Sequence, residues 1–169
     1  MKSLWENDSF ETNWKRVGDT YRWKGENVST TEVSNAFGSF PGIHEANVYG
    51  VTLPFHEGRA GCATVVLEPG VQKNFSWSAL LQHLQTKLPR YAIPIFIRLA
   101  KVDVGGMSTA TNKQVKTALR FEGVDPELRG TKVTGGRDDE ILWLPLGSNT
   151  YIPFEIKDWQ KLQARELKL

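Results

Sequence analysis

Hydrophobic residues recur along the chain at two spacings, one typical of helices and one typical of strands. The clearest helical stripe lies between 77 and 88, and its large side chains are Trp77, Leu80, Leu81, Leu84 and Leu88. Asn74 or Ser76 is the expected N-cap, and Pro89 ends the stripe because proline cannot continue a helix. The pattern predicts an amphipathic helix that buries its leucine face.

Three more helices are predicted by caps and shorter stripes. Ser29 with Glu32 forms a capping box before the apolar positions of 33–37, and Gly38 supplies the stop. Thr111 opens a second helix that ends at Gly123. Its apolar face is predicted to consist of Val115, Leu119 and Phe121. The last helix is predicted over about 157–168, with Trp159 and Leu162 turned inward.

Short strands alternate with these helices. A strand that turns at Gly25 comes first, and the last two strands form a hairpin whose turn is Gly147-Ser148. The expected strands are 21–28, 45–51, 61–68, 95–99, 141–146 and 149–154. The second and third are expected to pair as an antiparallel ribbon with a long connection. Irregular interleaving predicts an α+β fold, with an N-terminal ribbon and a central sheet flanked by about three to four helices.

Composition excludes several classes of protein and of metal site, but it does not indicate a reaction. With 169 residues and 40% hydrophobic residues, the chain is expected to be one ordinary globular domain, or one domain with appendages. Lys plus Arg number 21 against 19 Asp plus Glu, so bulk charge does not support nucleic-acid binding. Cys62 is the single cysteine, which excludes an internal disulfide and a cysteine-based metal site built from this chain alone. No membrane span or secretory signal is evident in the sequence.

Two segments could carry chemistry. Lys113 follows a glycine-, serine- and threonine-rich stretch over 104–112, and a lysine there could neutralise phosphate or carboxylate oxygens in a partner's cleft. The alternative is an ordinary surface lysine. The second segment, 16–27, carries two aromatic residues and three cations beside Gly25, so it could stack on a base and approach a phosphate closely. The alternative is an ordinary edge strand, which would have the same pattern. The three histidines are scattered, so no metal site is predicted.

One long string in the sequence resembles a known family. Residues 18–33, GDTYRWKGENVSTTEV, resemble the signature stretch of the fatty acid transport proteins and very-long-chain acyl-CoA synthetases. The resemblance continues through YAIPIFIRL at 91–99, EGVDP at 122–126 and the C-terminal hairpin, and it covers the chain from about Arg16 onward. Residues 1–15 are expected to be a poorly determined arm, and 16–169 a C-terminal lid domain.

The resemblance implies a role inside a larger enzyme. These proteins belong to the adenylate-forming superfamily, in which a large N-terminal domain binds ATP and the acyl group while a small C-terminal lid rotates between two half-reactions. A fatty acid and ATP, with Mg²⁺, give acyl-adenylate and pyrophosphate, and CoA then takes the acyl group. The chain is expected to be inactive without the large domain, and membrane association to come only from the missing part.

The resemblance also assigns residues. In the superfamily a lid lysine assists adenylation, and the stretch 109–113 matches the family segment, so Lys113 is the expected lysine. Ala110 and Asn112 depart from the family pattern, which leaves Lys116 as an alternative. The turn that meets the CoA channel in relatives corresponds to Arg22, Trp23, Lys24, Gly25 and Glu26.

The hinge between the two domains corresponds to Arg16, Gly18 and Asp19. Lys15 stands where the family has an aspartate, which predicts a chain that was cut or misjoined near the hinge. Rotation about a few such residues is the expected gating motion.

Other functions remain open at this point. A stand-alone CoA- or protein-binding module could keep the lid fold without catalysis. A nucleic-acid module built on residues 22–24 is disfavoured by the near-neutral charge. The ending Leu167-Lys168-Leu169 resembles a relaxed peroxisomal address. The chain itself is expected to be soluble and intracellular, and the parent protein to lie at the endoplasmic reticulum, peroxisome or lipid-droplet membrane.

Overall fold

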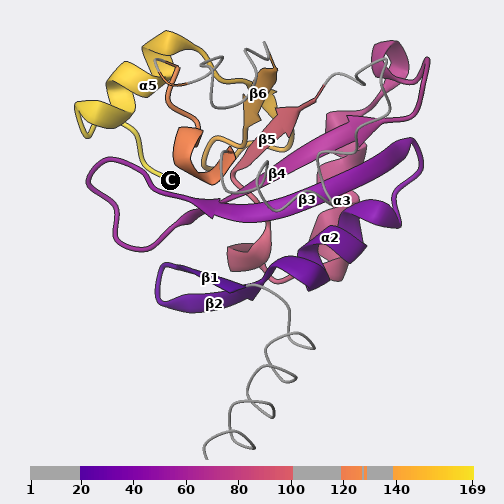
Figure 1. Cartoon of the computed structure of the whole chain (residues 1–169), viewed down its shortest axis with the longest axis horizontal. Coiled ribbons are helices and arrows are strands. Elements are labelled where there is room, and N and C mark those ends of the chain that lie inside the picture. The colour runs from indigo at the N-terminus through magenta and orange to yellow at the C-terminus, as the bar shows by residue number, and fades with distance from the viewer. Residues whose placement is uncertain (1–19, 101–118, 127, 129–138) are drawn as a thin grey trace, which may run out of the picture.

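The computed structural model describes residues 20–100, 119–126, 128 and 139–169. Short strands and helices alternate through these residues (Figure 1). In chain order the elements are β1 (Thr20–Trp23), β2 (Glu26–Ser29), α2 (Thr30–Gly38), β3 (Ile43–Val51), β4 (Ala60–Leu67), η1 (Gln72–Asn74), α3 (Trp77–Lys87), η2 (Arg90–Ala92), β5 (Phe96–Leu99), β6 (Glu140–Trp143), β7 (Ile152–Pro153) and α5 (Ile156–Gln163).

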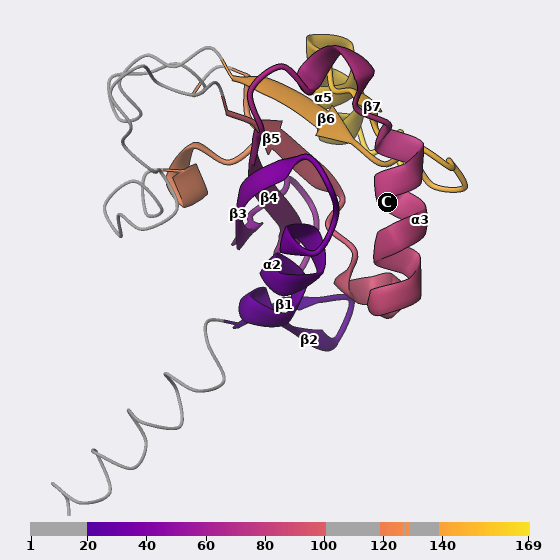
Figure 2. The same ribbon diagram turned by 90° about the vertical axis from the view of Figure 1, so that its right-hand side faces the viewer.

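The strands form two sheets. β1 and β2 pair as an antiparallel hairpin, and the second sheet has the order β3-β4-β5-β6-β7. Its neighbours are antiparallel except β4 and β5, which run parallel because α3 crosses over between them. The helices α2 and α3 lie on one side of this sheet, and α5 lies near β6 (Figure 2). The predicted α+β class, with a ribbon and a mixed central sheet, is confirmed.

The predicted caps explain where the helices begin. The Ser76 hydroxyl accepts a hydrogen bond from the Ala79 amide at 3.2 Å, so Ser76 rather than Asn74 is the cap of α3. The Ser29 hydroxyl accepts from the Glu32 amide at 3.4 Å at the start of α2. Both predicted helices are confirmed, and their apolar stripes pack into the core.

Two details of the predicted helices are wrong. α5 ends at Gln163, five residues early, because Arg165 adopts a left-handed φ of 59° and the Glu166 amide closes back on the Lys161 carbonyl. Phe121 is 69% exposed, although the pattern placed it on the apolar face with Leu119, which is buried. The start of that helix lies outside the described residues, and Gly123, at a φ of 57°, follows its last turn.

The core is apolar except for a buried group of charges. Buried leucine, valine and aromatic side chains from both sheets and from α2, α3 and α5 form one continuous cluster. Arg98, Glu122 and Asp139 lie within the same interior, each less than 5% exposed. No helix in the described ranges is long and apolar enough to cross a lipid bilayer.

Candidate functional site

The turn between β1 and β2 is built from two residues with positive φ. Lys24 has a φ of 50° and Gly25 a φ of 81°, and Trp23 pairs with Glu26 across the turn. The twist of such a turn matches the right-handed twist of the two strands, and the conformation favours glycine at its second position. A Cβ on Gly25 would meet no atom within 4 Å, so backbone conformation rather than space explains the glycine within this domain.

The turn presents its polar residues to solvent and keeps its aromatic ring inside. Arg22, Lys24, Gly25 and Glu26 are exposed, whereas Trp23 is only 5% exposed. The surface of the turn therefore carries the cations of Arg22 and Lys24, the carboxylate of Glu26 and the backbone of Gly25, which no side chain covers.

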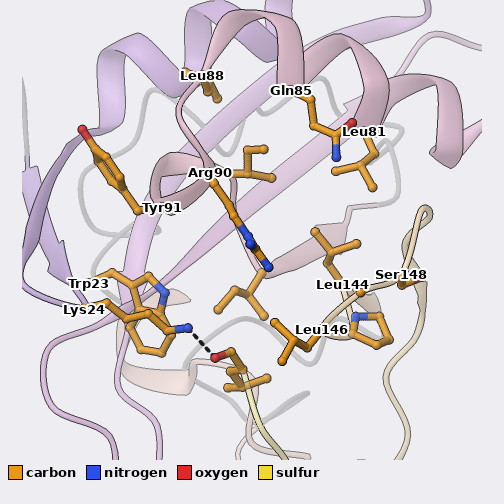
Figure 3. A pocket seen from close by; sticks show the side chains of 15 residues that line it. Trp23, Lys24, Leu81, Gln85, Leu88, Arg90, Tyr91, Leu144, Leu146 and Ser148 are labelled. Carbon is orange, nitrogen blue, oxygen red and sulfur yellow. Dashed lines mark hydrogen bonds between the residues drawn. The ribbon is translucent and has the colours of Figure 1, made fainter.

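A pocket of about 830 Å³ lies against this turn (Figure 3). Its walls come from β1, α3, η2 and the connection between β6 and β7. The apolar lining residues are Trp23, Leu81, Leu88, Ile93, Ile95, Leu144, Pro145, Leu146 and Leu169. An open pocket with apolar walls and a few polar groups is the usual form of a small-molecule site.

Two cations from separate elements stand at this pocket. The Lys24 ammonium lies 5.7 Å from the centroid of the Trp23 ring and donates a hydrogen bond to the carbonyl oxygen of Leu169. The Arg90 side chain, from η2, extends toward the middle of the pocket (Figure 3). The arrangement suits a ligand that has both an apolar or extended part and anionic oxygens.

The structure groups one of the three predicted sets of site residues. The five residues proposed for the CoA channel form a single turn, and two of them, Trp23 and Lys24, line the pocket. Lys113, the alternative Lys116 and the hinge residues Arg16, Gly18 and Asp19 lie outside the described residues.

Sequence reasoning missed Arg90 and Gln85 as members of this site. Gln85 lies on the polar face of the predicted helix, and Arg90 lies outside every predicted helix and strand. The only available signal was a cation directly after the helix-ending Pro89.

Residues 32–104 match the family model of the AMP-binding enzyme C-terminal domain. This part of the chain belongs to that family. The chain's recognition from residues 18–33 as a domain of the fatty acid transport protein group is confirmed by the relatives.

The C-terminal domain aligns with curated proteins over most of its own length. It is 52% identical over 151 residues, 89% of the chain and 25% of the relative, to the isopenicillin N epimerase component 1 of Hapsidospora chrysogena. It is 40% identical over 154 residues, 91% of the chain and 23% of the relative, to the very long-chain fatty acid transport protein of Cochliobolus heterostrophus. The long-chain fatty acid transport protein 3 of Homo sapiens is 39% identical over 154 residues, 91% of the chain and 21% of that protein. The chain thus spans about a quarter of the length of these relatives.

Solved structures support the fold. Coronafacic acid ligase of Pectobacterium brasiliense superposes with a TM-score of 0.54 at 12% identity, over 75% of this chain and 21% of the ligase. Apo MatB of Rhodopseudomonas palustris gives a TM-score of 0.50 at 24% identity, over 63% of this chain and 20% of that protein. These likenesses concern the fold alone.

Proposed function

We propose that this C-terminal domain is the lid of an ATP-dependent ligase that joins a long- or very-long-chain fatty acid to CoA. The proposal places Lys113 in the first half-reaction and the β1–β2 turn in the second. The observation that carries it is the exposed Lys24-Gly25 turn at the mouth of an apolar pocket, in a chain that is 40% identical to a very long-chain fatty acid transport protein.

In the first half-reaction a carboxylate oxygen of the fatty acid attacks the α-phosphorus of ATP, and pyrophosphate leaves. Negative charge concentrates on the phosphate oxygens as the new bond forms. The Lys113 ammonium would stabilise that charge inside a cleft that excludes water, where a fixed cation has its largest effect. ATP, Mg²⁺ and the acyl group would be held by the large N-terminal domain of the parent protein, and this chain would be inactive alone.

In the second half-reaction the CoA thiol attacks the acyl carbonyl carbon, and AMP leaves. The lid would turn so that the β1–β2 turn faces the CoA passage, with Gly25 leaving room for the narrow pantetheine arm. Lys24 and Arg90 supply two cations from different elements for the CoA phosphates. The apolar wall beside them fits the uncharged part of the same molecule.

The decisive experiment separates the two half-reactions. A chimera in which this chain replaces the matching quarter of the Cochliobolus relative is tested for pyrophosphate release, and for thioester formation from supplied acyl-adenylate. Lys113→Ala should lower pyrophosphate release roughly a hundredfold, the order expected for loss of a fixed cation, and spare the thioester step. Lys87→Ala, an exposed lysine on α3, is the matched control. A wild-type rate for Lys113→Ala with a loss for Lys116→Ala would move the role to Lys116.

A second acyl substrate is favoured by one specific observation. The relative with 52% identity carries isopenicillin N, rather than a fatty acid, in its name. Pyrophosphate release with isopenicillin N and with a very-long-chain fatty acid, each offered to the full-length parent protein, distinguishes the two. Because the acyl pocket belongs to the large domain in the proposal, swapping the lid alone should leave the preference unchanged.

The competing function is a stand-alone CoA- or protein-binding module. Saturable CoA binding by the isolated chain, together with no stimulation of any large domain, would favour it. The location of the parent protein is a separate proposal: we propose an intracellular membrane surface. A reporter fused to residues 158–169 that stays diffuse would contradict the peroxisomal address.

A further inference from the structure

The β1–β2 hairpin is too small to be held by its own pairing. It has two strands of four residues each and belongs to neither edge of the five-stranded sheet. An isolated two-stranded hairpin is only marginally stable in water. The orientation of the Lys24-Gly25 turn must therefore be fixed by contacts with other parts of the domain.

The first contact is a backbone clamp from the connection between β3 and β4. The Arg59 amide donates a hydrogen bond to the Arg22 carbonyl oxygen at 2.7 Å, and Gly58 forms an isolated antiparallel bridge with Trp23. Gly58 has a φ of 75°, and a Cβ there would lie 2.4 Å from the Arg22 carbonyl oxygen. Only glycine permits this approach of two backbones.

The second contact is a shallow seat for the Tyr21 ring. Gly50 and Gly61 face each other in the register of β3 and β4. A Cβ on Gly50 would lie 2.8 Å from the Tyr21 Cβ, and a Cβ on Gly61 would lie 2.4 Å from the Tyr21 hydroxyl. The missing side chains of this glycine pair make the space in which Tyr21 is buried, at 6% exposure. This burial also raises the pKa of the Tyr21 phenol well above its usual value.

The third contact is made by His56, which neither caps a helix nor belongs to the hydrophobic core. The His56 ring stacks on the Trp23 ring with centroids 5.9 Å apart and an interplanar angle of 26°. Its Nδ1 lies 2.8 Å from the Pro54 carbonyl oxygen, which fixes the ring within its own loop. His56 therefore links the loop directly to the residue that precedes the Lys24-Gly25 turn.

We propose that these contacts, here called the hairpin seat (Gly50, His56, Gly58, Gly61 and the Tyr21 ring), position the β1–β2 turn for the CoA half-reaction. The inference rests on the proposed function, and it assigns positioning residues rather than groups that touch CoA. None of the seat residues lines the pocket beside the turn. Damage to the seat should slow thioester formation and leave adenylation unchanged, because the lid presents this turn only in the second step.

The clamp is tested by Gly58→Ala in the chimera described above. The matched control is Gly70→Ala, since Gly70 has a similar φ of 79° but a Cβ there would meet no atom within 4 Å. Both variants carry the same backbone strain, and only Gly58→Ala collides with the hairpin. We expect thioester formation from acyl-adenylate to fall about tenfold or more in Gly58→Ala alone, since small misplacements of a positioned group have effects of this order. Pyrophosphate release should stay at the control rate.

A gentler variant keeps the inference testable if Gly58→Ala fails to fold. His56→Ala removes the stacked ring without adding a collision, and should raise the KM for CoA several-fold with little change in the KM for ATP. His56→Phe retains a ring over Trp23 and should restore most of the loss. His44→Ala is the control, because His44 is exposed and its partner is Glu68, outside the seat.

The outcomes separate the inference from the proposed function. If His56→Ala and Gly58→Ala form thioester at control rates, or if adenylation falls in the same proportion, the positioning role is wrong. If the unaltered chimera forms no acyl-CoA, the proposed function fails. Amide hydrogen exchange over residues 22–26 still tests the seat in that case. It should quicken in His56→Ala and not in His44→Ala, and equal exchange in both would overturn the inference.

Discussion

The guanidinium of Arg98 lies 3.0 Å from the carboxylate of Glu122, and neither side chain has any exposed surface. Asp139 completes the group, with its carboxylate oxygen 2.8 Å from the Arg98 Nε. These residues belong to β5, to the helical turn at 119–122 and to the residue before β6. The buried arginine therefore joins three segments that are distant in the sequence.

Loss of that arginine should destabilise the domain strongly. Arg98→Met keeps much of the side-chain volume but removes the guanidinium that pairs with the buried carboxylates of Glu122 and Asp139. Removing one partner of a buried ion pair typically costs about 3–5 kcal/mol of unfolding free energy. Urea unfolding followed by circular dichroism measures the change, with the exposed Arg22→Met as control. A loss no larger than that of Arg22→Met would mean that the ion group does not stabilise the fold.

The N-cap of α3 gives a smaller and more local prediction. Ser76→Ala removes the acceptor of the Ala79 amide and should lower the unfolding free energy by about 1 kcal/mol. Ser76→Asp should retain most of the stability, because aspartate is an equally good cap. Gln82→Ala, at an exposed position inside the same helix, should change stability by less than about 0.5 kcal/mol. Equal effects of the two alanine variants would contradict the capping role.

The sequence predicted those parts of the fold that depend on near neighbours. Caps such as Ser76 and the stop at Pro89 are set by interactions within a few residues, and the structure has both. Gly147 does lie in a turn, but Trp143 pairs with Ile152, so this turn is part of a longer connection over 144–151 and the two strands are shorter than predicted. The end of α5 was misjudged because the left-handed conformation of Arg165 is unusual for a residue with a side chain. Nothing in the local pattern marks such a residue as a helix terminator.

Long-range relationships could not be derived from the pattern. The parallel pairing of β4 with β5 depends on how α3 packs, and periodicity gives no direction for a strand. Arg98 lies within the short predicted strand 95–99, and nothing in the sequence pattern pairs it with Glu122. The turn at Gly25 was predicted from the local pattern and its role from the family resemblance, whereas the bridge between Trp23 and Gly58 exists only in three dimensions.

The single thiol should be almost unreactive in the native state. Burial raises the pKa of Cys62 to about 11, and hydrogen bonding to Tyr49 and the charge of Arg98 lower it by less. Since the thiolate is the nucleophile, only a very small fraction reacts at pH 8. Iodoacetamide labelling followed by mass spectrometry should be slow in buffer and fast in urea. Rapid labelling of the folded protein at pH 8 would contradict the burial of Cys62.

The raised pKa of Cys62 also makes the free energy of unfolding depend on pH. A thiol whose pKa is higher in the folded state keeps its proton there, while the unfolded chain loses it above about pH 9. Stability from this group is therefore complete below pH 9 and declines as the pH rises toward 11. Cys62→Ala should show a shallower decline over this interval in urea unfolding. An unchanged slope would mean that Cys62 ionises alike in both states.

The bare backbone at Gly25 permits a test that separates stability from function. Gly25→Asn adds a side chain, yet asparagine tolerates a positive φ better than most residues do, and no atom lies within 4 Å of the added Cβ. The unfolding free energy should fall by no more than about 1 kcal/mol. Thioester formation by the chimera should fall much further, because the side chain would enter the proposed pantetheine passage.

Gly70→Asn is the matched variant for this test, since Gly70 also has a positive φ, of 79°, and open space around it. It should show the same small loss of stability with no effect on either half-reaction. If Gly25→Asn forms thioester as fast as Gly70→Asn, then the β1–β2 turn does not enter the CoA passage. Lys24 and Arg90 would then need another ligand to explain their position at the pocket.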